Sequence, residues 1–257
     1  MNNIYRAIIA ATIIVVSIAN PTAAYCSEQS DSLKTTNYYN DYQFKSAQLV
    51  LPVSLMAVGT YGVYNTTMKK YRDDVKDGME KLRGDHYFHA DDYVQYLPMA
   101  AYLGLGAIGA KAKHPFRERF VAGATAYLSL GIITNVAKHS FKEKRPDTNA
   151  RNSFPSGHTA TVFMGAELMR IEYGNYWGLG AYTVATAVGF LRMYNNRHWF
   201  NDVLAGAGVG IISARIGYWM LPLWRKWFKW DKNLQVVAMP SYDIYTNTLS
   251  VGFAACF

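Results

Sequence analysis

Apolar residues recur along the chain in six long stretches that are separated by short polar or basic segments. The stretches are rich in alanine, glycine and leucine and are too long for typical strands, so they predict helices. They cover residues 49–64, 93–110, 120–136, 159–171, 176–193 and 203–221. Small residues, as in AGAGVGIISA, allow close helix packing. The pattern predicts an all-α fold built as a six-helix bundle.

The two ends of the chain follow other patterns. Residues 1–24 place Arg6 before the apolar stretch AIIAATIIVVSIA and small residues, which is typical of a signal peptide cleaved after Ala24. An uncleaved signal anchor is the alternative. Residues 25–44 are polar and are interpreted as a tether, and residues 45–232 then form the helical domain. Residues 233–257 alternate β-branched and aromatic positions around YTNT, which predicts a short C-terminal β-hairpin.

Composition narrows the class of partner. Hydrophobic residues make up 51% of the chain and charged residues 17%, which is compatible with membrane contact. The net charge of +8, from 26 basic and 18 acidic residues, suits an anionic partner such as a phosphate ester or an anionic membrane surface. The chain has no zinc-finger spacing and no nucleic-acid signature, so we expect no nucleic-acid partner.

Charge also bears on membrane topology. The stretches 93–110 and 120–136 nearly reach the length of a membrane span, whereas charged residues interrupt 159–171 and 203–221. The basic connector KAKHPFRER and the basic residues that follow the sixth stretch are expected in the cytoplasm. This orientation places the loops around residues 138–158 outside.

These expectations conflict if residues 49–64 also span the membrane. Cleavage after Ala24 leaves residue 25 outside, and one more span then inverts every later loop. Either residues 49–64 lie in the membrane interface, or the bundle is peripheral or water-soluble. Membrane association is the favoured interpretation.

Three short stretches carry candidate chemistry at predicted helix ends. KHSFKEKRP contains Lys138 and Arg145, although such a charge run is most often a solvated loop. FPSGHT places Ser156 and Gly157 at a helix start, where a missing side chain lets an anion approach the free amides. His158 follows directly in this stretch.

The third stretch, RMYNNRHWFND, contains Arg192, His198 and Asp202. The last two are four residues apart, so on a helix the carboxylate can hold an imidazole NH, although the same spacing makes an ordinary surface salt bridge. Packing alone does not explain two histidines, three cations and one aspartate at helix ends of an exported basic chain.

Together, the three stretches resemble the signature of the type 2 phosphatidic acid phosphatase and vanadium haloperoxidase superfamily. The resemblance is carried by Lys138-x6-Arg145-Pro146, Pro155-Ser156-Gly157-His158 and Arg192-x5-His198-x3-Asp202. It implies a phosphoric ester hydrolase that needs no metal and no cofactor. Two departures are Leu191, where the family usually has serine, and the short link at residues 147–154, which leaves little material for a cap.

By this similarity His198 is the nucleophile that forms a phosphohistidine, and Asp202 fixes its tautomer. His158 protonates the leaving oxygen and then deprotonates the attacking water. The phosphate would be bound by Lys138, Arg145, Ser156, Gly157 and Arg192. The remaining histidines, His86, His89, His114 and His139, are expected at the surface.

The resemblance implies a phosphatase acting on a lipid-linked phosphate on the periplasmic side of a bacterial envelope, in association with the membrane. Lipid A is the first choice, and an isoprenyl pyrophosphate or a phosphatidyl phosphate also fits. The alternatives are a soluble periplasmic non-specific acid phosphatase, a vanadium-dependent haloperoxidase and a catalytically inactive binding protein. The sequence does not indicate an oligomeric state.

Overall fold

The computed structural model describes residues 44–228 and 230 and the segments 235–243 and 248–256. The predicted signal peptide, and the tether up to residue 43, lie outside the described residues. The helices belong to one compact unit, Tyr42–Phe228. In the other unit, strands β1 (Gln235–Asp243) and β2 (Thr248–Cys256) pair antiparallel, with Gln235 opposite Cys256.

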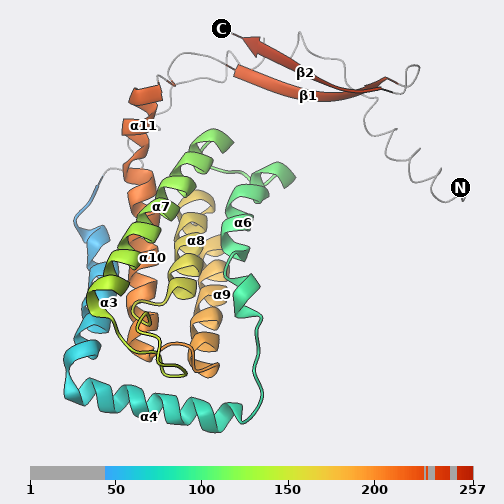
Figure 1. Ribbon diagram of the computed structural model, residues 1–257. Coiled ribbons are helices and arrows are strands. Elements are labelled where there is room, and N and C mark those ends of the chain that lie inside the picture. Colours follow the sequence, from blue (N-terminus) through green and yellow to red (C-terminus); the bar gives the residue numbers. More distant parts are fainter. Residues whose placement is uncertain (1–43, 229, 231–234, 244–247, 257) are drawn as a thin grey trace, which may run out of the picture. The chain divides into compact units, whose positions relative to one another are not determined.

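Five long helices run alongside one another in the helical unit, and α10 packs against three of them, α3, α7 and α8 (Figure 1). The five are α3 (Ala47–Tyr64), α7 (Phe116–Phe141), α8 (Gly157–Tyr173), α9 (Asn175–Tyr194) and α10 (Phe200–Trp219). Helix α9 packs mainly on α8, and the short α6 (Leu97–Gly104) packs on α7 and α8. The predicted all-helical domain is therefore confirmed.

The count of six helices is too low for the described residues. Helix α4 (Thr66–Arg83) was not predicted because it is mostly polar and has no buried residue. Helix α11 (Leu221–Phe228) follows α10 as a separate element. The stretch 93–110 is also not one helix: it contains the end of α5 (Asp91–Val94), α6 and a 3₁₀ turn, Leu105–Ile108.

Helix α4 runs across one end of the bundle (Figure 1). Asn65 caps its start, because the Asn65 side chain accepts hydrogen bonds from two backbone amides of the first turn. Arg72 of α4 donates to Glu143 at 2.5 Å, and Glu80 accepts from Asn196 at 2.8 Å. Helix α4 thereby joins the loop after α7 to the loop before α10.

Two close approaches hold the helices at this end together. A β-carbon added to Gly206 of α10 would lie 2.6 Å from the Ser156 carbonyl oxygen, so the start of α8 packs directly on α10. A β-carbon added to Gly62 would lie 2.8 Å from the Asn201 β-carbon, which brings the end of α3 to the start of α10. Any larger side chain at either position would push these helix ends apart.

Apolar surface on the outside of the bundle supports membrane association. Three segments of the described chain are long and apolar enough to cross a membrane: Ala47–Tyr64, Phe116–Phe141 and Phe200–Phe228. On α7 the side chains of Phe120, Leu128, Ile132 and Val136 are 55–69% exposed. Large exposed apolar faces of this kind are rare on soluble monomers and mark membrane or partner contacts.

Glu167 of α8 and Arg215 of α10 do not face outward. Glu167 is fully buried and accepts hydrogen bonds from Arg170 at 2.7 Å and from Arg215 at 2.7 Å. Because Arg215 is paired with Glu167 inside the bundle, its charge does not interrupt the apolar outer surface of α10, contrary to the expectation from sequence. Arg170 of α8 has a 38% exposed side chain, and α8 is not among the three membrane-length segments of the described chain.

His114 corrects another expectation. His86, His89 and His139 are exposed as predicted, but His114 is buried. Its Nδ1 lies 2.9 Å from Glu172 Oε2, and its backbone amide donates to Glu172 Oε1 at 2.6 Å. This pair joins the connector before α7 to the end of α8, far from the start of α8 where His158 lies.

Candidate active site

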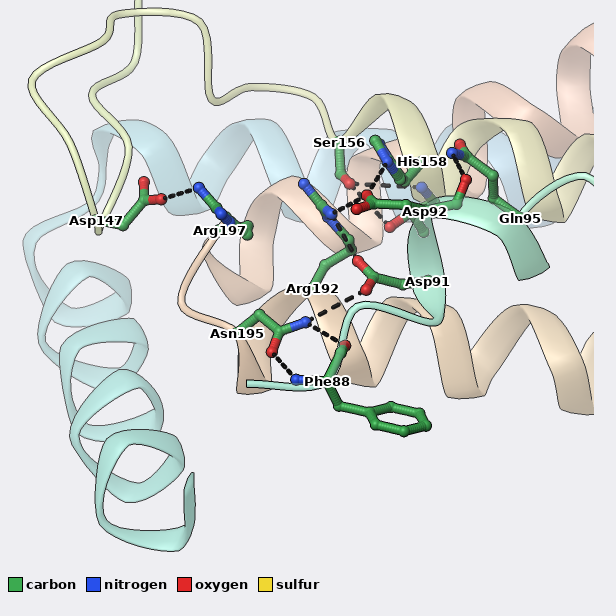
Figure 2. Close-up of polar contacts among 11 residues, drawn as sticks. Phe88, Asp91, Asp92, Gln95, Asp147, Ser156, His158, Arg192, Asn195 and Arg197 are labelled. Carbon is green, nitrogen blue, oxygen red and sulfur yellow. Dashed lines mark hydrogen bonds and ion pairs between the residues drawn. The ribbon is translucent and has the colours of Figure 1, made fainter. Parts of the chain in front are cut away.

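The predicted site residues lie at one end of the helical unit because successive helices alternate in direction. Four helix ends meet there: the end of α7, the start of α8, the end of α9 and the start of α10. They carry Lys138, Ser156, Gly157, His158, Arg192 and Asp202, and the adjoining loops carry Arg145 and His198. The short helix α5 approaches the same place (Figure 2).

His198 and Asp202 form the buried centre of this cluster. Their Nδ1 and Oδ2 atoms are 3.5 Å apart, and both side chains are almost fully buried. The Ser153 hydroxyl donates a short hydrogen bond to the same Asp202 oxygen and lies 3.5 Å from His198 Nδ1. Asp202 Oδ2 also accepts from the backbone amide of Trp199 at 3.0 Å. The carboxylate is thus fixed from several sides beside the imidazole.

Ser156 and Gly157 begin helix α8. The Ser156 side chain accepts from the Thr159 amide and, at 2.9 Å, from the Thr159 hydroxyl, so it serves as the helix cap. The Ser156 amide donates to the Asp202 carbonyl at 3.0 Å, which ties α8 to α10. A β-carbon at Gly157 would meet no other part of the described chain within 4 Å. The helix start is therefore open on that side.

Arg192 is buried, and its guanidinium is only partly paired. Nη1 donates to Asp91 Oδ2 at 2.6 Å and lies 3.5 Å from Asp92 Oδ1 (Figure 2). Its buried Nε has no hydrogen-bond partner in the part of the chain that the structure describes. A buried unpaired donor is costly, and an anion would satisfy this one.

Lys138 and Arg145 converge on the link between the first two motifs. Lys138 Nζ donates to the Asn152 carbonyl at 2.9 Å, and Arg145 Nε donates to the Asn152 side chain at 2.8 Å. Asp147 of the same link accepts from Arg197 at 2.9 Å (Figure 2). The short link therefore orders the cations beside the site.

The environment of His198 favours the neutral imidazole. Burial lowers the pKa of His198 well below its usual value, and the charges of Arg192, Arg145, Lys138 and His158 lower it further. A neutral imidazole has a free lone pair, which a nucleophile requires.

His158 has a more balanced environment. Burial and the charge of Arg192 lower the pKa of His158, whereas a hydrogen bond to Asp92 opposes this shift. His158 Nε2 lies 3.0 Å from Asp92 Oδ1 (Figure 2). The two histidines therefore differ in their ability to carry a proton.

The cluster also contains four residues outside the three motifs that predicted it: Asp91, Asp92, Asn152 and Ser153. The only signal in the sequence was an adjacent pair of carboxylates in a basic chain. The described residues contain no cluster of three His, Cys, Asp or Glu side chains placed to hold a metal ion. The unpaired Arg192 donor, with the nearby cations, instead suits an oxyanion.

The fold and the cluster define a class of protein: a helical bundle with two imidazoles and several cations at one end. Residues 120–226 match the PAP2 superfamily. The chain is 40% identical over 158 residues to "Lipid A 1-phosphatase" of Porphyromonas gingivalis, an alignment that covers 58% of this chain and 36% of that protein. It is 37% identical over 71 residues to "Bacitracin transport permease protein BcrC" of Bacillus licheniformis, covering 28% of this chain and 34% of that protein.

The chain spans about a third of the length of the curated relatives that it matches. Two solved structures are also similar. Aquifex aeolicus LpxE is 21% identical with a TM-score of 0.43, covering 55% of this chain and 93% of the other. A transmembrane PAP2 type phosphatidylglycerolphosphate phosphatase from Bacillus subtilis is 17% identical with a TM-score of 0.47, covering 68% and 96%.

Proposed function

We propose that this protein is a phosphatase that hydrolyses a phosphate monoester or pyrophosphate of an envelope lipid through a phosphohistidine intermediate. The observation that carries the proposal is the buried, unpaired Nε of Arg192 in a cluster with two histidines of different environment. Phosphoryl transfer mostly requires positioning and neutralisation of charge on the phosphoryl oxygens. Lys138, Arg145 and Arg192, with the open start of α8 at Gly157, supply these functions.

The proposed first step uses both histidines. The neutral His198 attacks phosphorus through Nε2, while Asp202 holds the Nδ1 side of the ring. His158 gives its proton to the leaving oxygen as the P–O bond breaks. In the second step His158 takes a proton from water, which attacks the phosphohistidine and releases phosphate.

A lipid substrate is supported by the exposed apolar face of α7 and by the three membrane-length segments. Lipid A is our first choice, because a 40% identical relative is named a lipid A 1-phosphatase. We further propose that the site lies on the periplasmic side, since the basic connector before α7 lies at the opposite end of the bundle and basic ends favour the cytoplasm.

Phosphate release by the purified protein from four substrates tests this proposal: lipid A, an isoprenyl pyrophosphate, phosphatidate and para-nitrophenyl phosphate. We expect the highest kcat/KM with a lipid. Equal rates on all four, together with recovery of the protein in a detergent-free aqueous extract, would instead indicate a soluble non-specific phosphatase. Vanadate-dependent halide oxidation without phosphate release would indicate a haloperoxidase, and no turnover of any kind a binding protein.

A further inference from the structure

A second carboxylate contacts the proposed catalytic groups. Asp92 Oδ1 lies 3.0 Å from His158 Nε2 and 3.5 Å from Arg192 Nη1 (Figure 2). Asp92 comes from α5, a region outside the three motifs that contain the other site residues. Asp92 therefore lies on the leaving-group side of the site, beside His158, and not beside the nucleophile.

The backbone around Asp92 is fixed by hydrogen bonds. Asn195 accepts from the Phe88 amide at 3.1 Å and donates to the Phe88 carbonyl at 2.8 Å. Gln95 donates to the Asp92 carbonyl at 2.8 Å, and the neighbouring Asp91 is held by Arg192 (Figure 2). The carboxylate of Asp92 is therefore presented to His158 by an anchored segment and not by a free loop.

His158 needs such a partner because burial and the charge of Arg192 oppose its protonation, whereas Asp92 and, more weakly, Asp91 favour it. The groups that face it are Asp91 and Asp92 from α5, Arg192 from α9 and His198 before α10. Of these, Asp92 makes the hydrogen bond to its ring. Within the described chain, Nδ1 of His158 makes no hydrogen bond, and the side chain is 30% exposed. The Nδ1 side is thus free for a substrate.

We infer that Asp92 is a positioning residue for His158, and this inference rests on the proposed function. Asp92 accepts a hydrogen bond from Nε2–H, which directs Nδ1 toward the leaving oxygen. The pair is a counterpart of Asp202 and His198, so each imidazole of the reaction has its own carboxylate.

The protons balance through both steps. As the His198 N–P bond forms and the P–O bond breaks, the Nδ1 proton of His158 passes to the leaving oxygen. His158 is then neutral and keeps Nε2–H on Asp92. In the second step the water oxygen forms a bond to phosphorus as the His198 N–P bond breaks, and Nδ1 of His158 takes the proton of that water, which restores the starting state.

The substitution Asp92→Asn tests the inference through the leaving group. A poor leaving group, such as the alkyl oxygen of phosphatidate, depends on protonation, whereas the aryl oxygen of para-nitrophenyl phosphate depends on it far less. We expect kcat to fall about ten- to a hundredfold on phosphatidate and only a fewfold on para-nitrophenyl phosphate. The alkaline limb of the pH profile should move to lower pH, and Asp92→Glu should restore part of the rate.

Asp77→Asn is the matched control, because Asp77 lies on α4 with a 65% exposed side chain. It should leave both substrates unaffected. An equal loss on both substrates with an unmoved alkaline limb would overturn the inference in favour of a structural role. Unchanged kcat with tighter inhibition by inorganic phosphate would also overturn it, since Asp92 would then only occupy the phosphate site.

An NMR titration of ¹⁵N-labelled histidine in the full chain separates this inference from the proposed function. The Nε2–H tautomer of His158 should predominate in the wild type, and in Asp92→Asn both this preference and the pKa should fall. A protein that hydrolyses no phosphate ester contradicts the proposed function, whatever this titration gives. If His158 titrates identically in both proteins, the pair itself is contradicted.

Discussion

Asp91 and Arg192 form a buried ion pair, with 2.6 Å between Oδ2 and Nη1, that joins α5 to the end of α9. Asn195 Nδ2 donates to Asp91 Oδ1 at 3.3 Å, so the Asp91 carboxylate has two partners, Arg192 and Asn195, that lie close together in the sequence (Figure 2). Because Nη1 is held in this way, the guanidinium has a fixed orientation. Its Nε stays unpaired within the described chain and available to a ligand.

Removal of one partner from this pair should be costly. Asp91→Ala leaves the buried Arg192 charge with only the longer contact to Asp92, at 3.5 Å. Removal of one partner of a buried ion pair typically destabilises a protein by about 3–5 kcal/mol. We expect a clear fall in the thermal unfolding midpoint, measured for both proteins in the same detergent. Asp85→Ala is the control, because Asp85 is exposed in the same segment. Equal midpoints for the Asp91 and Asp85 variants would show that the pair does not stabilise the fold.

Ser153 should affect catalysis through Asp202. Ser153→Ala removes a buried hydroxyl that donates to the Asp202 carboxylate, and hydrogen bonds to charged groups contribute about 1.5–3 kcal/mol. We expect kcat to fall about ten- to a hundredfold while KM changes little, because Ser153 orients the nucleophile and does not touch the phosphate. A change in KM alone would contradict this role. Ser140→Ala, on an exposed position of α7, is the control.

The nucleophile can be identified by trapping the intermediate. Rapid quenching of the wild type with ³²P-labelled substrate should give an acid-labile, base-stable phosphoenzyme. His198→Ala should give none and should lose activity by a factor on the order of 10⁶, as expected when a covalent nucleophile is removed. His139→Ala changes an exposed histidine and should behave as the wild type. A labelled phosphoenzyme in His198→Ala would assign the nucleophile to another residue.

Burial of His198 should also make stability depend on pH. The pKa of His198 is lowered in the folded state, whereas in the unfolded chain it is about 6.5. At pH values between these two pKa values the unfolded chain therefore binds more protons than the folded protein. The contribution of His198 to the free energy of unfolding is complete above its unfolded-state pKa and decreases as the pH falls toward its folded-state pKa. In His198→Gln this part of the acid destabilisation should disappear, which the unfolding midpoint between about pH 7 and 5 would reveal. His139→Gln should keep the dependence of the wild type.

Local patterns predicted one side of the candidate site. The residues from Ser156 to His158, and from Arg192 to Asp202, occupy helix ends where a few residues of sequence determine their proximity. In the structure, the alternating directions of α8, α9 and α10 bring these ends together. Ser153 escaped notice because a lone serine in a short link carries no periodic signal.

Contacts between distant segments account for what the sequence did not reveal. Asp91 and Arg192 are 101 residues apart, and His114 and Glu172 are 58 apart. No hydrophobic period or short motif connects such pairs, so their burial depends on tertiary packing. Helix α4 escaped prediction for a related reason, since its polar residues lie across the bundle end without entering the core.

The direction of α3 sharpens the conflict over membrane topology. Gln48, at its start, accepts from Trp219 at the end of α10 at 3.2 Å, and Gly62 lies against Asn201 at the start of α10. The helix therefore begins at the end opposite the candidate site. If α3 crosses the membrane and the site faces the periplasm, residue 47 starts in the cytoplasm, which export of residue 25 by a signal peptide does not allow.

Cysteine labelling in intact cells resolves this conflict. Single cysteines would be placed at Ala150, beside the site, and at Lys113, in the connector at the other end, after Cys26 and Cys256 are changed to serine. Both positions are exposed in the bundle. We expect a membrane-impermeant maleimide to label Ala150→Cys from outside, because the site is proposed to face the periplasm. If Ala150→Cys is labelled only after the cells are permeabilised, the proposal that the site faces the periplasm is contradicted.

Labelling at Lys113 then separates the two remaining interpretations, a bundle that spans the membrane and a bundle that lies wholly outside. If Lys113→Cys is labelled only after permeabilisation, the bundle spans the membrane with its basic end inside, and residues 1–24 cannot act as an export signal for residue 25. If Lys113→Cys is labelled as readily as Ala150→Cys, the whole bundle lies outside, and α3 packs on α10 without crossing. Mass spectrometry of the mature N-terminus provides the control, because cleavage after Ala24 is expected only in the second case.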